Sequence, residues 1–113
     1  MSNLPFEKLH AYQQAKLLLE CVREAAISEP RLRDQALRAA TSVCLNMSEG
    51  AGRAGYGDKA RVYAIARGEN SEAAAALDIA LGAGLCAVGP ARKGMEHARV
   101  VHALLCGLIR RFG

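Results

Sequence analysis

The residues best suited to hold a metal ion lie near the C-terminal end of the sequence. His102 and Cys106 are four residues apart, so on a helix both side chains share one face and could bind one metal ion. His97 precedes them, and Cys86 could add a third ligand. No Cys-x-x-Cys pair is present, however, and isolated His and Cys residues on apolar helices usually belong to the core. We therefore expect neither a metal site nor a bound cofactor.

Two further patterns could indicate catalysis. The segment 50–55 matches Gly-x-Gly-x-x-Gly, the fingerprint of dinucleotide-binding proteins. That fingerprint must follow a strand, whereas the pattern here follows an expected helix, so a glycine-rich hinge is the better interpretation. Glu69 and Glu72 share a helix face, but nothing in the sequence indicates the pocket that acid–base catalysis requires. We therefore expect no catalytic residues and no enzymatic activity.

Basic side chains remain as the main functional signal. The 113-residue chain has 15 Lys and Arg residues against 11 Asp and Glu residues, which gives a formal net charge of +4. Lysine and arginine neutralise phosphates without reading base sequence, and Tyr56 or Tyr63 could stack on unpaired bases. The candidate nucleic-acid-binding residues are Arg53, Lys59, Arg61, Arg67, Arg110 and Arg111. A merely solvated surface is the alternative, because acidic residues interleave with the basic ones.

The composition predicts which elements position these side chains. Hydrophobic residues make up 51% of the chain and aromatic residues only 4%, so the apolar content is mostly Ala and Leu. Such a composition favours helices over strands. The length suits a single domain over residues 1–113. We expect an all-α protein, an antiparallel up-down-up-down four-helix bundle.

The apolar spacing places the helices at about 5–27, 31–49, 58–85 and 91–112. Pro5 suits the first turn of a helix, and Gly50 is placed to end the second. The segment 50–57 that follows has four glycines in eight positions, which predicts an exposed, mobile turn. Asp58 can cap the third helix. Gly89 and Pro90 are expected to lie outside the helices.

The second helix has two distinct faces. Small residues form its core stripe, whereas Leu37, Cys44 and Leu45 fall outside that stripe. The polar stripe consists of Gln35, Arg38, Ser42, Asn46 and Glu49. We interpret it as a hydrogen-bonded seam against another helix, with a plain solvated face as the alternative. Because Glu49 lies at the helix C-terminus and opposes the dipole, it needs a cationic partner, for which Arg38, Arg53 and Arg67 are the candidates.

The last helix is apolar nearly all round between Val100 and Ile109. A helix that is apolar on every side needs burial on every side, and a small bundle leaves one side open. We therefore expect the chain to pack against copies of itself. The candidate interface residues are Leu37, Leu45, Val100, Leu104 and Leu108.

The N-terminal residues do not resemble a signal peptide. Free thiols are accordingly the expected state of the four cysteines. No apolar run approaches the ~20 residues of a membrane span. We therefore expect a cytoplasmic protein that does not associate with membranes.

Several segments together resemble a known family. The opening Phe6-Glu7-Lys8-Leu9, with Tyr12 and Ala15, is one of them. The most characteristic comprises Gln35, Arg38-Ala39-Ala40, Ser42-Val43, Asn46, Glu49-Gly50 and Gly52-Arg53. Asp58, Ile65-Ala66-Arg67-Gly68, Glu72, Leu77, Ile79-Ala80 and Ile109 continue it. These residues resemble the four-helix-bundle family encoded in 23S rRNA intervening sequences. Ala36-Leu37 and Glu69 depart from the family's pattern.

The resemblance implies an up-down-up-down bundle that assembles as a ring of five copies. It also implies kinship with the accessory protein of diversity-generating retroelements, which works with a reverse transcriptase and RNA. Together with the clustered basic residues, this predicts a non-catalytic homo-oligomeric module that binds RNA or DNA through backbone phosphates. The alternative is a protein-interaction scaffold that holds a partner protein and binds no nucleic acid.

Overall fold

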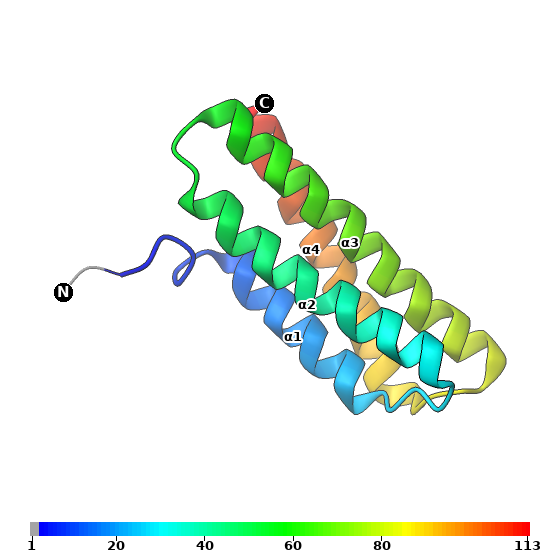
Figure 1. Ribbon diagram of the computed structural model, residues 1–113. Coiled ribbons are helices and arrows are strands. Elements are labelled where there is room, and N and C mark those ends of the chain that lie inside the picture. The colour runs from blue at the N-terminus through cyan, green and yellow to red at the C-terminus, as the bar shows by residue number, and fades with distance from the viewer. Residues whose placement is uncertain (1–2) are drawn as a thin grey trace.

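A computed structural model of the chain is a bundle of four helices, shown in Figure 1, and the structure describes residues 3–113. The helices are α1 (His10–Glu24), α2 (Pro30–Gly52), α3 (Tyr56–Ala83) and α4 (Val88–Phe112). No strand occurs within the described residues. The prediction of an all-α four-helix bundle is confirmed.

Each helix packs against two neighbours: α1 and α3 both lie between α2 and α4. At one end of the bundle the Ser28 backbone N–H donates to the Leu85 carbonyl at 2.8 Å, which joins the α1–α2 and α3–α4 connections. At the other end the Tyr56 ring lies 5.1 Å from the Phe112 ring, so the start of α3 meets the end of α4. Consecutive helices therefore run in opposite directions, as the colour gradient in Figure 1 shows.

The core between the helices is built mainly from small side chains. About half of the buried hydrophobic residues are alanines, and the larger buried residues, such as Leu18, Met47, Leu77 and Leu105, are spaced along all four helices. Alanine on facing helices allows close approach of their backbones. Within the described residues, none of the helices has both the length and the apolar character that crossing a bilayer requires.

The prediction that Pro5 starts the first helix is wrong. Residues 5–8 form a turn, and α1 begins only at His10. The turn satisfies its own backbone groups, because the Leu4 N–H donates to the Glu7 carboxylate at 3.0 Å and the Leu9 N–H to the Phe6 carbonyl at 3.0 Å. α2, in contrast, has a side-chain N-cap, since the Glu29 carboxylate accepts hydrogen bonds from two backbone N–H groups of the first turn.

Gly50 does not end α2, contrary to the prediction, because the helix continues to Gly52. Gly50 is buried, and a Cβ built on it would lie 2.7 Å from Cε1 of Tyr63 on α3. Its missing side chain thus makes room for an aromatic ring between α2 and α3. The connection between α2 and α3 therefore comprises residues 53–55, which is shorter than the predicted turn 50–57.

Three other details differ from the prediction. Asp58 lies within the first turn of α3, and Gly55 occupies the N-cap position. Gly89 and Pro90 belong to the first turn of α4. The α3 helix ends at Ala83, and Gly84 caps it with a φ of 68°, in the left-handed region that suits glycine. Cys44 is buried, although it falls outside the core stripe, because α1 covers that side of α2.

We predict that Gly50→Ala lowers the free energy of unfolding by about 1–3 kcal/mol, because the new Cβ would overlap the buried Tyr63 ring. Gly68→Ala in the middle of α3 is the matched control, because a Cβ there meets no atom within 4 Å. Gly68→Ala should raise the free energy of unfolding by about 0.5–1 kcal/mol, because alanine has a higher helix propensity than glycine. Urea denaturation measures both changes, and a stabilising Gly50→Ala would contradict the packing argument.

Candidate functional site

Most of the basic side chains predicted to contact nucleic acid lie at one end of the bundle. They are Arg53, Lys59, Arg61, Arg110 and Arg111. The first three come from the α2–α3 connection and the start of α3, and the other two from the last turn of α4. The segments meet where the Lys59 ammonium lies 5.6 Å from the centre of the Phe112 ring. Figure 1 shows the C-terminus beside the start of α3. We call residues 53–61 together with 110–113 the basic end.

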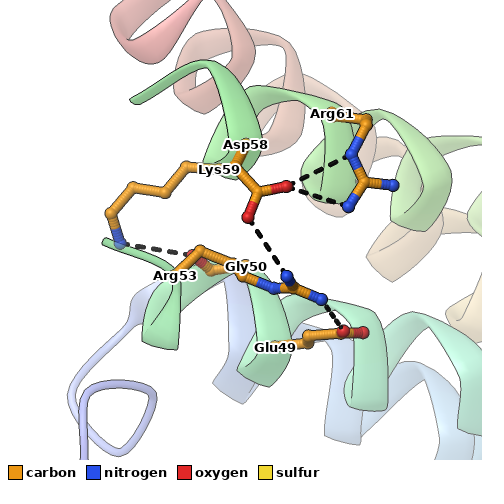
Figure 2. A network of polar contacts seen from close by, with 6 residues as sticks. All are labelled: Glu49, Gly50, Arg53, Asp58, Lys59 and Arg61. Carbon is orange, nitrogen blue, oxygen red and sulfur yellow. Dashed lines mark hydrogen bonds and ion pairs between the residues drawn. The ribbon is translucent and has the colours of Figure 1, made fainter. Parts of the chain in front are cut away.

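Arg53 and Arg61 already have carboxylate partners at this end (Figure 2). Arg53 donates to the Glu49 carboxylate and, at 3.1 Å, to Oδ2 of Asp58. Arg61 donates to Oδ1 of the same Asp58 from two nitrogens, at 2.9 and 3.2 Å. Of the three arginines considered as partners for Glu49, Arg53 is the one that forms the ion pair. Arg53 therefore links the end of α2 to the start of α3, whereas the Arg61 ion pair lies within α3.

Lys59 has a different local role. Its ammonium group donates to the carbonyl oxygen of Gly50 at 3.2 Å (Figure 2) and to that of Ala51 at 2.8 Å. Both carbonyls belong to the last turn of α2, where they have no partner within the helix. The positive charge also lies at the negative end of the α2 dipole. Lys59 thus acts as a C-terminal cap of α2 supplied by α3.

Arg110 and Arg111 differ from Arg53 and Arg61 because no carboxylate pairs with them among the described residues. Both side chains are exposed. The Arg111 guanidinium lies 5.2 Å from the centre of the Phe112 ring, which leaves its charge available to solvent. Unlike Arg53, Arg61 and Lys59, these two arginines could bind a phosphate without giving up an ion pair or a helix cap.

The two tyrosines considered for base stacking differ in exposure. Tyr63 is only 2% exposed and lies against Gly50, so the expectation that it stacks on a base is wrong. Burial also raises the pKa of its hydroxyl group. Tyr56 is 67% exposed and contacts Phe112 edge to face. Of the two tyrosines, Tyr56 is therefore the one whose ring is open to a ligand at the basic end.

The polar stripe of α2 runs along the side of the helix that adjoins α3. At its first half, Arg38 donates to Glu69 at 3.2 Å and to Glu72 at 2.6 Å, both on α3. Gln35 accepts a hydrogen bond from the same arginine at 3.3 Å. At its second half, Glu49 reaches Arg53, as described above. In the middle, the Asn46 side chain donates to the carbonyl and hydroxyl oxygens of Ser42 within the helix.

The five residues predicted to form an interface between subunits fall into two groups. Leu45 is 64% exposed and Val100 42% exposed. Leu37, Leu104 and Leu108 are partly buried, because they pack against the core. The single chain thus covers part of the apolar surface of α4 by itself. Leu45 lies on α2 and Val100 on α4, which are diagonal to each other in the bundle.

The remaining candidate residues lie on the flanks of the bundle. Arg67 does not reach the basic end, since its guanidinium group lies 3.6 Å from Sγ of Cys106 on α4. His102 Nε2 lies 3.5 Å from the same sulfur. His97 is separated from that pair and bonds to Gln14 on α1 at 3.0 Å. The Gly-x-Gly-x-x-Gly segment begins inside α2, so no strand leads into it.

Asp58 and Phe112 are the residues of this site that sequence reasoning missed. Asp58 was considered only as a helix cap, yet it follows Arg53 by five residues and precedes Arg61 by three. The spacing to Arg61 is that of an ion pair on one helix and was a usable signal. Phe112 contacts Tyr56 and Tyr63, and only the folded chain brings these aromatic residues together.

The Asp58 ion pairs predict a specific pH dependence. The hydrogen bond from Arg61, aided by Arg53, lowers the pKa of the Asp58 carboxyl group. The folded state therefore binds this proton more weakly than the unfolded chain. The stability contributed is fully present above the ordinary carboxyl pKa of about 4 and is lost as the pH falls through the lower folded-state pKa.

We expect Asp58→Asn to unfold at lower urea concentration than the wild type at neutral pH, because Arg61 loses its charged partner and Arg53 loses one of two. The difference between the two should narrow as the pH falls below about 4. Asp78→Asn is the control, since Asp78 is exposed and forms no ion pair among the described residues. A difference for Asp58→Asn that stayed constant with pH would contradict this assignment.

Comparison with known proteins adds the family. The family model described as "23S rRNA-intervening sequence protein" matches residues 7–107. No curated protein matches the sequence. The matched region runs from the turn before α1 to the last turns of α4, so it covers all of the first three helices. The chain belongs to the 23S rRNA-intervening sequence protein family.

Proposed function

We propose that this protein is a non-catalytic, cytoplasmic helical module that assembles with copies of itself and binds RNA or DNA through backbone phosphates. The observation that carries the proposal is the convergence of five cations from two distant segments on one end of the bundle. Two carboxylates, Glu49 and Asp58, lie among them, so the basic end keeps a net positive charge. Such a cluster attracts phosphates irrespective of base sequence.

The basic end also has the features needed for contact with a single strand. Arg110 and Arg111 are exposed and have no carboxylate partner among the described residues. Tyr56 lies on the same end with most of its ring exposed. An aromatic ring next to free cations is the usual arrangement for stacking one base while the neighbouring phosphates are neutralised.

Self-assembly of this module is supported by the positions of its exposed apolar side chains. Leu45 and Val100 project from helices that are diagonal in the bundle, so they lie on different faces of the molecule. Two different surfaces suit a head-to-tail contact, which closes into a ring when the rotation between subunits allows it. A ring of five copies is what the resemblance to the family implies.

A protein-interaction scaffold is the second candidate function. It is favoured by the ion pairs of Arg53 and Arg61, which neutralise part of the basic end. The scaffold would hold a partner protein against its exposed apolar residues. Nucleic-acid binding distinguishes the two, because the scaffold requires none.

The variant Arg110→Gln/Arg111→Gln tests the leading proposal. Against an RNA hairpin and a DNA duplex, measured by filter binding over a salt series, it should bind more weakly than the wild type. Its plot of log affinity against log salt should be flatter by about 2, since two phosphate contacts are lost. The matched control is Arg92→Gln/Lys93→Gln, which makes the same charge change near the other end of α4. Absence of binding at low salt, or an equal loss in the control, would overturn the proposal in favour of the scaffold.

Assembly is tested by placing a charge on each apolar face separately. Leu45→Glu and Val100→Glu should each sediment as smaller species than the wild type, because a head-to-tail contact needs both faces. An equimolar mixture of the two variants should form dimers, since one intact contact is restored per pair. Ile79→Glu on α3, also at an exposed apolar residue, is the control and should assemble normally. A wild-type monomer, or a mixture that stays monomeric, would contradict head-to-tail assembly.

A further inference from the structure

One cysteine lies between a histidine and an arginine on the flank where α3 meets α4. Cys106 and His102 are one turn apart on α4, and the Cys106 Sγ lies 3.5 Å from His102 Nε2. Arg67 projects from α3, and its guanidinium nitrogen lies 3.6 Å from the same sulfur. The three side chains thus come from two helices, away from the basic end, and the proposed function uses none of them.

The donors and acceptors of this cluster suit a nucleophilic thiol. A guanidinium group can only donate, so Arg67 donates to the sulfur. The thiol keeps its own proton to give, and His102 Nε2 can accept it when the other ring nitrogen carries the ring proton. A base within reach of the thiol and a cation beside the sulfur are the two groups that activate cysteine nucleophiles.

The other three cysteines lack this combination. Cys21 and Cys44 are each 7% exposed, and burial raises the pKa of both thiols. Cys86 is partly exposed, like Cys106, but no hydrogen bond from a histidine or arginine to it occurs among the described residues. Neighbouring groups, and not exposure alone, therefore distinguish Cys106 from Cys86.

Space for a small reagent exists beside the cluster. Gly107 follows Cys106, and a Cβ built on it would meet no atom within 4 Å. The same holds for Gly68, which follows Arg67. Cys106 itself is partly exposed, so a small reagent can approach its sulfur from solvent.

We propose that Cys106 is a reactive thiol that exchanges with low-molecular-weight disulfides. The Cys106 sulfur attacks one sulfur of the disulfide, so that a mixed disulfide forms and the other sulfur leaves as a thiolate. The proton of the Cys106 thiol passes to His102, and Arg67 stabilises the negative charge on the attacking sulfur. The reaction is an exchange, so the incoming disulfide is the only oxidant that it needs.

The test compares the four cysteines within one protein. The fully reduced protein is treated with the uncharged reagent 4,4′-dithiodipyridine, and the modified cysteines are identified by peptide mass spectrometry over time. Cys106 should react at least about tenfold faster than Cys86. Arg67→Met and His102→Gln should each slow the reaction of Cys106, while the rate of Cys86 stays unchanged and reports an intact fold.

Two controls separate activation of the thiol from simpler explanations. Arg92→Met removes a cation from the start of α4 and should leave the Cys106 rate unchanged. An anionic aromatic disulfide used in parallel shows whether Arg67 merely attracts a charged reagent. Equal rates for Cys106 and Cys86, unchanged rates in both variants, or acceleration restricted to the anionic reagent would overturn the proposal.

Discussion

Small side chains between α2 and α3 set the distance between the backbones of these two helices, and the polar contacts across them depend on that distance. Ala36, Ala39 and Ala40 on α2 are fully buried, and Gly50 has no side chain where the Tyr63 ring lies. Because the two backbones approach closely, polar groups along the edge of this contact come within hydrogen-bond reach. Arg38 can then span to Glu69 and Glu72, and Lys59 to the last carbonyls of α2. The ion pairs are thus a consequence of the packing and add to it.

The number of helices, their order and the faces that they bury were predictable from apolar spacing and composition. The exact residues at which the helices begin and end were less predictable, because they depend on contacts with neighbouring helices. Glycine at position 50 predicts a helix end by propensity, yet the Tyr63 ring makes a missing side chain favourable inside the helix. Cys44 lies outside the core stripe of its own helix, and only the position of α1 explains its burial. Propensity describes a single helix, whereas these two residues depend on its neighbours.

The sequence predicted most of the residues that lie at the candidate site, but not all of the contacts that they make. Alternating helix directions place the α2–α3 connection and the end of α4 together, so the meeting of Lys59 with Phe112 follows from the topology. The spacing of Asp58 and Arg61 also indicates an ion pair. In contrast, the exposure of Tyr56 and the burial of Tyr63 depend on how α3 is rotated against α2, which the sequence of one helix does not specify.

In the proposed function, the ion pairs at the basic end would weaken phosphate binding without preventing it. Arg53 and Arg61 are partly solvent-exposed, and exposed ion pairs of this kind contribute little to stability. A polyanion that brings several phosphates to the same place can therefore replace Glu49 or Asp58 as the partner at small cost. Arg110 and Arg111 need no such exchange, so in the proposed function they would make the first contacts with a phosphate backbone. Arg53 and Arg61 would then bind phosphate only where a second phosphate lies close to α2. The carboxylates thus favour extended polyanions over single phosphates, because a single phosphate offers too few charges to compensate for the ion pair that it breaks.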